Sequence, residues 1–178
     1  MTSFIIKAQA SRPIPEFWRK DRECAFCHII RRAAHAYRIY DDDHVIAFLD
    51  ILPLRHGHTL VVPKIHCPRV SELPPEYAAS VGKAISKISN ALTKAVDNTA
   101  LNVVCNQEYA QVVPHVHYHI VPAPRLDDSP PAAGSGPRKL DRKALPIGQA
   151  MHREECESRN ALEEDDAHAL VERIKAHL

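Results

Sequence analysis

The histidine-rich stretch at residues 114–122 constrains the fold of this chain more than any other segment. It reads Pro-His-Val-His-Tyr-His-Ile-Val-Pro, so a histidine alternates with an apolar residue three times. A strict period of two is typical of a half-buried β-strand, because successive side chains leave a strand on opposite faces. The pattern predicts a strand with its apolar side chains toward a core and its histidines on the other face. These histidines are His115, His117 and His119.

Three imidazoles on one face of a strand favour chemistry over simple packing. Neighbouring side chains on that face stand roughly 6.5–7 Å apart along the strand. They can be three metal ligands, or one nucleophile with two supporting groups. The chain holds 12 histidines, so a chance pattern is the alternative, but the regular spacing inside an apolar run argues against it. If one of them is a nucleophile, the middle residue, His117, suits that role best because it has a partner on each side.

Length and charge limit the class of protein. A chain of 178 residues is most simply one domain with extensions. The formal net charge of +1 argues against a basic nucleic-acid-binding face, but it allows one small anionic substrate. No run of about 18 apolar residues occurs and the N-terminus lacks the pattern of a signal peptide, so we expect an intracellular protein, cytoplasmic or nuclear, with no membrane partner. The five cysteines are then expected as reduced thiols or metal ligands.

Periodicity predicts an α+β domain at residues 23–125. Apolar residues at spacings of three and four predict one main helix at residues 75–96. Alternating or continuous apolar runs predict five strands, at residues 37–40, 44–50, 58–63, 101–105 and 114–122. Short connections favour antiparallel pairing, so we expect a five-stranded antiparallel sheet covered by one main helix.

Segments of different composition flank this domain. Residues 1–22 are expected to be an extension with room for one short helix, and residues 126–150 have the composition of a linker. Residues 151–178 are strongly charged and carry a loose apolar stripe. An acidic run at residues 163–166 lies near the expected helix start, where the helix dipole favours negative charge. We expect a terminal amphipathic helix, docked on this subunit or on a partner.

A second motif, Cys24-x-x-Cys27-His28, has several chemical readings. Attachment of c-type haem requires an export route that the N-terminus does not indicate, and a thioredoxin-like site requires a preceding strand that the polar residues before Cys24 do not provide. Half of a zinc site is the favoured functional reading. The structural alternative is a pair of buried free cysteines, which behave as small apolar residues.

Four segments in order, within about residues 24–125, resemble the histidine triad (HIT) family of nucleotide hydrolases and transferases. The closest similarity is to its nucleoside phosphoramidase (Hint-like) branch, in particular to zinc-containing fungal-type members with an acidic C-terminal helix. The resemblance implies the HIT-like fold, a homodimer and a purine nucleotide of the AMP type as substrate. The similar segments are Cys24–Ile30, Val45–Ile51, Gly57–His66 and Gln111–His119.

The resemblance also implies roles for individual residues. His117 would attack the α-phosphate of a nucleoside 5′-phosphoramidate to form a phosphohistidine, while Gln111 and His119 would contact the phosphoryl oxygens. Asp50 would accept the ribose hydroxyls, although an aspartate before a loop is also an ordinary turn residue. Asn106 is the best match to a loop asparagine of the family. An apolar base pocket, whose alternative is ordinary core, would consist of Phe26, Ile29, Phe48 and Ile51.

The resemblance further implies a metal site of two cysteines and two histidines. The ligands would be Cys24, Cys27, His66 and His115. Four protein ligands make a closed, structural zinc site, so no metal would be required for catalysis.

Two departures from the family pattern put the leaving group in doubt. Val112 stands where phosphoramidases often carry a serine, and the loop at residues 106–110 lacks the family's glycine. Two alternatives therefore remain: a dinucleoside polyphosphate hydrolase, and a zinc-stabilised nucleotide-binding protein with little catalysis.

Overall fold

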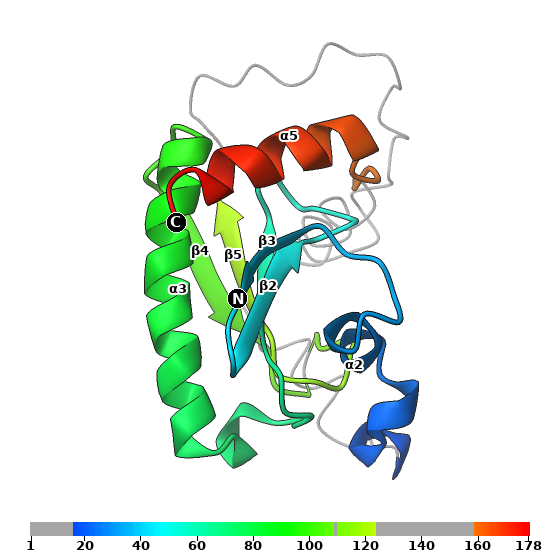
Figure 1. Ribbon diagram of the computed structural model, residues 1–178. Coiled ribbons are helices and arrows are strands. Elements are labelled where there is room, and N and C mark those ends of the chain that lie inside the picture. Colours follow the sequence, from blue (N-terminus) through cyan, green and yellow to red (C-terminus); the bar gives the residue numbers. More distant parts are fainter. Residues whose placement is uncertain (1–15, 109, 124–158) are drawn as a thin grey trace, which may run out of the picture.

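Figure 1 shows the computed structural model, which describes residues 16–108, 110–123 and 159–178. Its centre is an antiparallel sheet of five strands in the order β1-β2-β3-β5-β4. The strands are β1 (Arg38–Asp41), β2 (Val45–Leu49), β3 (Thr59–Pro63), β4 (Leu101–Cys105) and β5 (Tyr118–Pro122). The predicted α+β fold with a five-stranded antiparallel sheet is confirmed.

The two central strands, β2 and β3, are buried along their whole length. Their side chains divide between two layers, as the period of a strand requires. Val45 and Leu49 face the layer that contains the long helix α3 (Pro75–Ala95), whereas Phe48 faces the short helix α2 (Ala25–Ile30). In Figure 1, α3 runs along one side of the sheet and α2 lies on the other.

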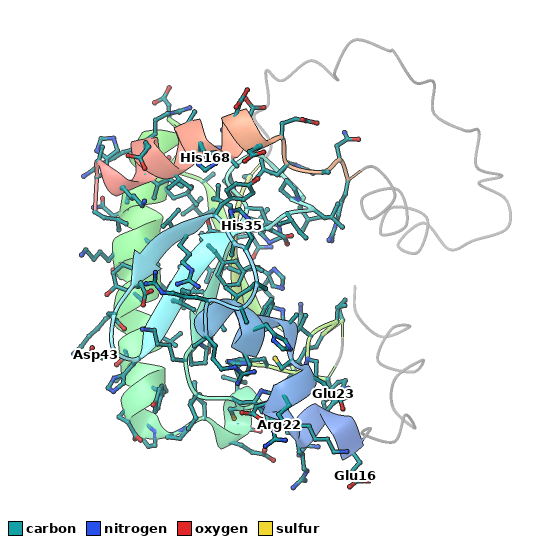
Figure 2. All side chains as sticks on the ribbon, turned by 45° about the vertical axis from the view of Figure 1, so that its right-hand side comes forward. Glu16, Arg22, Glu23, His35, Asp43 and His168 are labelled. Atoms are coloured by element: carbon teal, nitrogen blue, oxygen red, sulfur yellow. The ribbon has the colours of Figure 1, made fainter. Side chains whose placement is uncertain are left out.

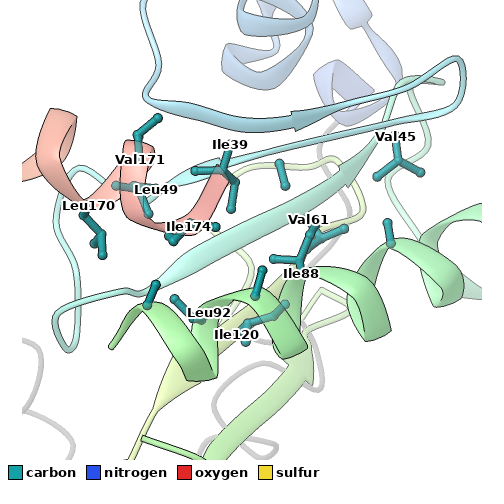
Figure 3. Packing of buried hydrophobic residues seen from close by; sticks show 14 of the residues in the cluster. Ile39, Val45, Leu49, Val61, Ile88, Leu92, Ile120, Leu170, Val171 and Ile174 are labelled. Carbon is teal, nitrogen blue, oxygen red and sulfur yellow. The ribbon is translucent and has the colours of Figure 1, made fainter. Parts of the chain in front are cut away.

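The main helix agrees with its prediction to within one residue. Pro75 occupies the first turn, where the missing N–H of proline costs nothing. The buried stripe on α3 includes Val81, Ile88 and Leu92. Figure 3 shows Ile88 and Leu92 directed toward Val61 and Ile120 of the sheet.

The C-terminal helix α5 (Glu164–Lys175) docks on this same chain. Its buried face, which includes Leu170, Val171 and Ile174, packs into the core that α3 shares with the sheet (Figure 3). The rings of Tyr37 and His168 also meet edge to face, with their centres 5.5 Å apart. Figure 2 labels His168 on α5. Of the two docking sites expected for this helix, the structure therefore shows the one on its own subunit.

Short helical turns connect the larger elements. Two 3-10 turns, η1 (Glu16–Arg19) and η2 (Asp21–Glu23), lead into α2, where one short helix was expected before residue 23. A further 3-10 turn, η3 (Val70–Glu72), lies between β3 and α3 and was not predicted. The expected linker at residues 126–150 lies outside the described residues. Within the described part of the chain, no helix is both long and apolar enough to cross a membrane.

The histidine-rich strand is shorter than predicted, because β5 begins only at Tyr118. Upstream of it, the backbone leaves β3: the amide of Val116 donates to the carbonyl of Cys67 at 2.7 Å instead of continuing the ladder. Val116 accordingly packs in a small separate cluster with Cys67 and Leu73. His115 and His117 thus occupy an irregular segment, and only His119 lies on a strand. The expectation of three histidines along one strand is wrong for this reason.

Candidate active site

The register of the sheet gathers polar residues at one end of the face that carries Phe48. In that register Phe48 pairs with Leu60, and Leu60 pairs with His119, so the three side chains share a face. Just beyond the paired residues, the amide of Asp50 donates to the carbonyl of His58 at 2.9 Å. Asp50, His58 and His119 therefore converge at this end of the sheet, with ligand atoms within 4.8 Å of one another.

His117 is also buried, and a backbone carbonyl two residues upstream orients its ring. Its Nδ1 lies 2.7 Å from the carbonyl oxygen of His115. A carbonyl can only accept, so Nδ1 carries the proton and Nε2 keeps a free electron pair. Burial lowers the pKa of His117 below its ordinary value, which keeps the ring neutral at neutral pH. The arrangement gives a neutral, oriented imidazole whose Nε2 has a free electron pair.

A second histidine pair orients the ring of His119. Its Nδ1 lies 2.9 Å from Nε2 of His58. The amide of Leu54 donates to Nδ1 of His58 at 3.2 Å, so His58 donates from Nε2 and His119 accepts at Nδ1. The remaining nitrogen of His119, Nε2, is then the donor of that ring. Burial lowers the pKa of both His58 and His119 to about 4, and both rings are neutral.

Sequence reasoning missed His58, which was assigned no role. Its position at the start of an apolar strand was the one sequence feature of His58 that hinted at a buried role. Its partner became identifiable only through the pairing of Leu60 with His119.

Asp50 lies at the end of β2, as expected for a rim residue. Its Oδ1 accepts the amide of Leu52 at 2.9 Å, which is the turn role considered as the alternative. Its Oδ2 stands 3.3 Å from Nδ1 of His58. Because His58 is neutral, we treat this approach as a polar contact and not as an ion pair. The next residue, Ile51, is 62% exposed, so it lies at the surface and not in the core.

The expected apolar pocket is partly built. The rings of Phe26 and Phe48 meet at 5.6 Å, and Phe26 also contacts the ring of His117 at 5.1 Å. Ile29 packs against the same cluster. Phe26 thus forms an apolar wall directly beside His117.

Gln111 is buried, and in this structure it holds the loop before β5. Its Nε2 donates to the carbonyl of Pro68 at 2.9 Å, and its Oε1 accepts the amide of Glu108 at 2.7 Å. Glu108 and Ala110 adopt positive φ angles of 63° and 53°, which is the conformation that a glycine would adopt without strain. Asn106 directly follows β4 in this loop. The phosphate contact of Gln111 and the substrate-binding role of Asn106 remain predictions.

Val112 also lies on this loop and is 92% exposed. It lines a surface cavity of about 240 Å³ together with Lys20, Glu23 and Cys24. Its side chain has no polar atom with which to assist a leaving amine.

A separate cluster brings together the four predicted metal ligands. Nδ1 of His115 lies 3.5 Å from Sγ of Cys24, and Nδ1 of His66 lies 3.3 Å from Sγ of Cys27. In a tetrahedral zinc site the bond lengths place sulfur and nitrogen ligands about 3.5 Å apart. The spacing of these side chains therefore fits such a site.

Hydrogen bonds fix both histidines of this cluster in the ligating tautomer. Nε2 of His115 donates to the carbonyl of Pro63 at 2.8 Å, and Nε2 of His66 donates to the carbonyl of Trp18 at 3.1 Å. Both rings then present Nδ1, with its free electron pair, to the cysteines. Burial and the neighbouring Cys24 raise the pKa of the Cys27 thiol to about 12, so a bound cation is required to ionise it at neutral pH.

Comparisons with known proteins agree with this arrangement. Residues 31–126 match the HIT domain family. An adenylylsulfatase of Arabidopsis thaliana, HINT3, is 35% identical over 138 residues, covering 75% of this chain and 70% of the plant protein. A HIT-like protein of Methanocaldococcus jannaschii is 43% identical over 101 residues, covering 56% of this chain and 78% of the archaeal one.

Two solved structures are similar over most of the chain. A hypothetical histidine triad nucleotide-binding protein from Sulfolobus tokodaii gives a TM-score of 0.67 at 28% identity, over 86% of this chain and 91% of that protein. A zinc-bound histidine triad family protein from Mycobacterium smegmatis gives 0.63 at 26% identity, over 88% and 96%. The chain belongs to the histidine triad (HIT) family and has its fold.

Proposed function

We propose that this protein is a hydrolase that cleaves nucleoside 5′-phosphoramidates of the AMP type through a covalent intermediate on His117. The observation that carries the proposal is the 2.7 Å contact between Nδ1 of His117 and the carbonyl of His115. It leaves Nε2 of a neutral, buried imidazole free to attack. Membership of the HIT family and the adenylylsulfatase relative support a hydrolase acting on nucleotides.

The first step is a displacement at phosphorus. The electron pair on Nε2 of His117 forms a bond to the α-phosphorus while the bond from phosphorus to the leaving nitrogen breaks. A phosphoramidate nitrogen that is already protonated leaves as a neutral amine with the electron pair of that bond. The ring of His117 then carries phosphorus on Nε2 and a proton on Nδ1, and the carbonyl of His115 stabilises the resulting positive charge.

The second step returns the enzyme to its starting state. A water oxygen bonds to phosphorus, the bond to Nε2 breaks and returns its electron pair to His117, and one water proton passes to solvent. His119 donates from Nε2 to a phosphoryl oxygen, and His58 keeps its ring in that orientation. Asp50 accepts the ribose hydroxyls, and Phe26, Ile29, Phe48 and Ile51 contact the base.

The metal cluster serves the fold in this proposal. Cys24, Cys27, His66 and His115 would hold zinc with all four positions filled by protein. When bound, the ion cross-links α2 to the segments that follow β3 and precede β5. The relation to the zinc-bound protein of Mycobacterium smegmatis supports this assignment. Catalysis requires no metal.

A sulfated nucleotide is the second candidate substrate. The relative from Arabidopsis thaliana is an adenylylsulfatase, and Val112 offers nothing to a leaving amine. Adenosine 5′-phosphosulfate would react through the same nucleophile with sulfate as the leaving group.

We also propose a homodimer in solution, joined along the edge strand β4. Val103 and Val104 are exposed on this strand, and an uncovered apolar edge is a ready pairing surface. A monomer in sedimentation equilibrium at micromolar concentration would refute this assembly.

The function is tested by turnover of adenosine 5′-phosphoramidate and adenosine 5′-phosphosulfate by the wild type and by His117→Ala, each with and without a chelator. We expect turnover in the wild type, an unchanged initial rate with chelator, and at least about a thousandfold loss in the variant. A folded wild type that binds AMP but cleaves neither compound would refute the hydrolase and leave a nucleotide-binding protein.

A further inference from the structure

The C-terminal segment lies outside the residues that match the HIT domain, but it is tied to the loop beside the candidate active site. The amide of Leu162 donates to the carbonyl of Ile51 at 3.0 Å, which ties the segment to the loop that follows Asp50. Arg159 lies three residues upstream of this tie, and its Nε is buried. Helix α5 continues directly from this segment and is anchored in the core, so the segment is held at both points.

The charge of Arg159 is close enough to the candidate active site to act on two of its histidines. Its positive charge acts on both His58 and His119 and contributes to the lowering of their pKa. The negative charge of Asp50 has the opposite effect and opposes the lowering of the pKa of His119 and His117. His119 therefore experiences both a positive charge, that of Arg159, and a negative charge, that of Asp50.

We infer that Arg159 is a substrate-binding residue that contacts the phosphoryl oxygens of the bound nucleotide. The inference rests on the proposed function, which places an anionic phosphate beside His117 and His119. In a site of neutral histidines, that phosphate would otherwise lie next to the Asp50 carboxylate, and the two negative charges would repel. A guanidinium offsets the repulsion and matches phosphate oxygens with two parallel hydrogen bonds.

The test compares two ligands that differ only in the phosphate. The affinities of the full-length wild type, Arg159→Gln and Arg159→Lys for AMP and for adenosine are measured by calorimetry. Arg159→Gln should weaken AMP binding about tenfold, the value of a charge-assisted hydrogen bond, and leave adenosine binding unchanged. Arg159→Lys should recover part of the AMP affinity, because it keeps the charge but loses the fork. Lys175→Gln is the matched control, since it removes one positive charge from an exposed position on α5.

The outcomes separate the inference from the function on which it rests. Equal AMP affinity in the wild type and Arg159→Gln would overturn the inference while the nucleotide site stands. Equal weakening of AMP and adenosine would also overturn it, because it would assign Arg159 a structural role. A wild type that binds AMP no better than adenosine would refute the phosphate site itself. In the expected case, KM for the phosphoramidate rises by a similar factor in Arg159→Gln alone.

Discussion

Burial and a backbone carbonyl together determine the protonation and the tautomer of His117. Burial alone would leave the tautomer of the ring undefined, and the carbonyl alone would raise its pKa. Together they give a neutral ring with Nε2 free. A carbonyl also fixes the tautomer of His115. Its Nε2 donates to a carbonyl, so Nδ1 keeps the electron pair that could bind a metal. In our proposal, His115 and His117 have different roles because the backbone carbonyls occupy different ring nitrogens, Nε2 in His115 and Nδ1 in His117.

The role of His58 predicts a difference between two substitutions. His58→Gln retains a donor that can reach Nδ1 of His119, whereas His58→Leu leaves that buried nitrogen without the donor it has now. We expect His58→Leu to lower kcat about tenfold or more, because an unsatisfied buried polar group costs about 1–3 kcal/mol. His58→Gln should recover most of this loss. Steady-state kinetics on both variants decides, and equal kcat values would contradict the positioning role.

His58 also makes stability depend on pH. Its pKa is about 4 in the folded protein and near 6.5 in the unfolded chain. Between these values the unfolded chain binds the extra proton, so acid favours unfolding. The contribution is fully present above about pH 6.5 and falls by at most about 1.4 kcal/mol per pH unit below it. Urea unfolding of the wild type and His58→Gln from neutral to mildly acid pH measures this, and parallel curves would refute it.

Among the helices, α5 stands out because it lies beyond the matched domain and still completes the core. Its apolar face packs with α3 and the sheet, and its approach to the sheet carries Arg159. The docking of α5 therefore contributes to the core and, in our proposal, also holds Arg159 near the site.

Leu170→Ala should destabilise the protein by about 2–5 kcal/mol, because it opens a cavity in a fully buried position. Glu172→Ala is the matched control on the exposed side of α5 and should change stability by no more than about 0.5 kcal/mol. Urea denaturation of both variants provides the measurement. A loss below about 1 kcal/mol for Leu170→Ala would show that α5 is only loosely docked.

We expect the stability of helix α2 to depend on the proposed metal. Cys27→Ser should abolish bound zinc, measured by elemental analysis, and lower Tm, because structural zinc contributes to folding directly. Its kcat at a temperature where the protein stays folded should remain within a few-fold of the wild type. Cys105→Ser, outside the cluster, is the control and should retain the metal. Zinc retained by Cys27→Ser, or kcat lost along with the metal, would contradict a purely structural site.

For the whole molecule, strong periodicity in the sequence predicts the sheet and α3. The cluster of Cys24, Cys27, His66 and His115 is implied only by the resemblance to the HIT family, because the local motif gives no more than its two cysteines. The start of β5 at Tyr118 is not predictable in this way, because the bond between Val116 and Cys67 competes with the ladder. The proposed roles of His58 and Arg159 depend on the register of the strands and on the packing of the C-terminal segment against the sheet, and neither can be read from local sequence.

The covalent intermediate is tested most directly by looking for the nucleotide on His117. Wild-type protein mixed with adenosine 5′-phosphoramidate is quenched in base within the first turnover, when a phosphohistidine survives, and its intact mass and peptides are measured. We expect a mass increase of one AMP group that is located on His117 and is absent from His117→Ala. Rapid turnover with no adduct in the wild type, or the same adduct in His117→Ala, would contradict the covalent mechanism.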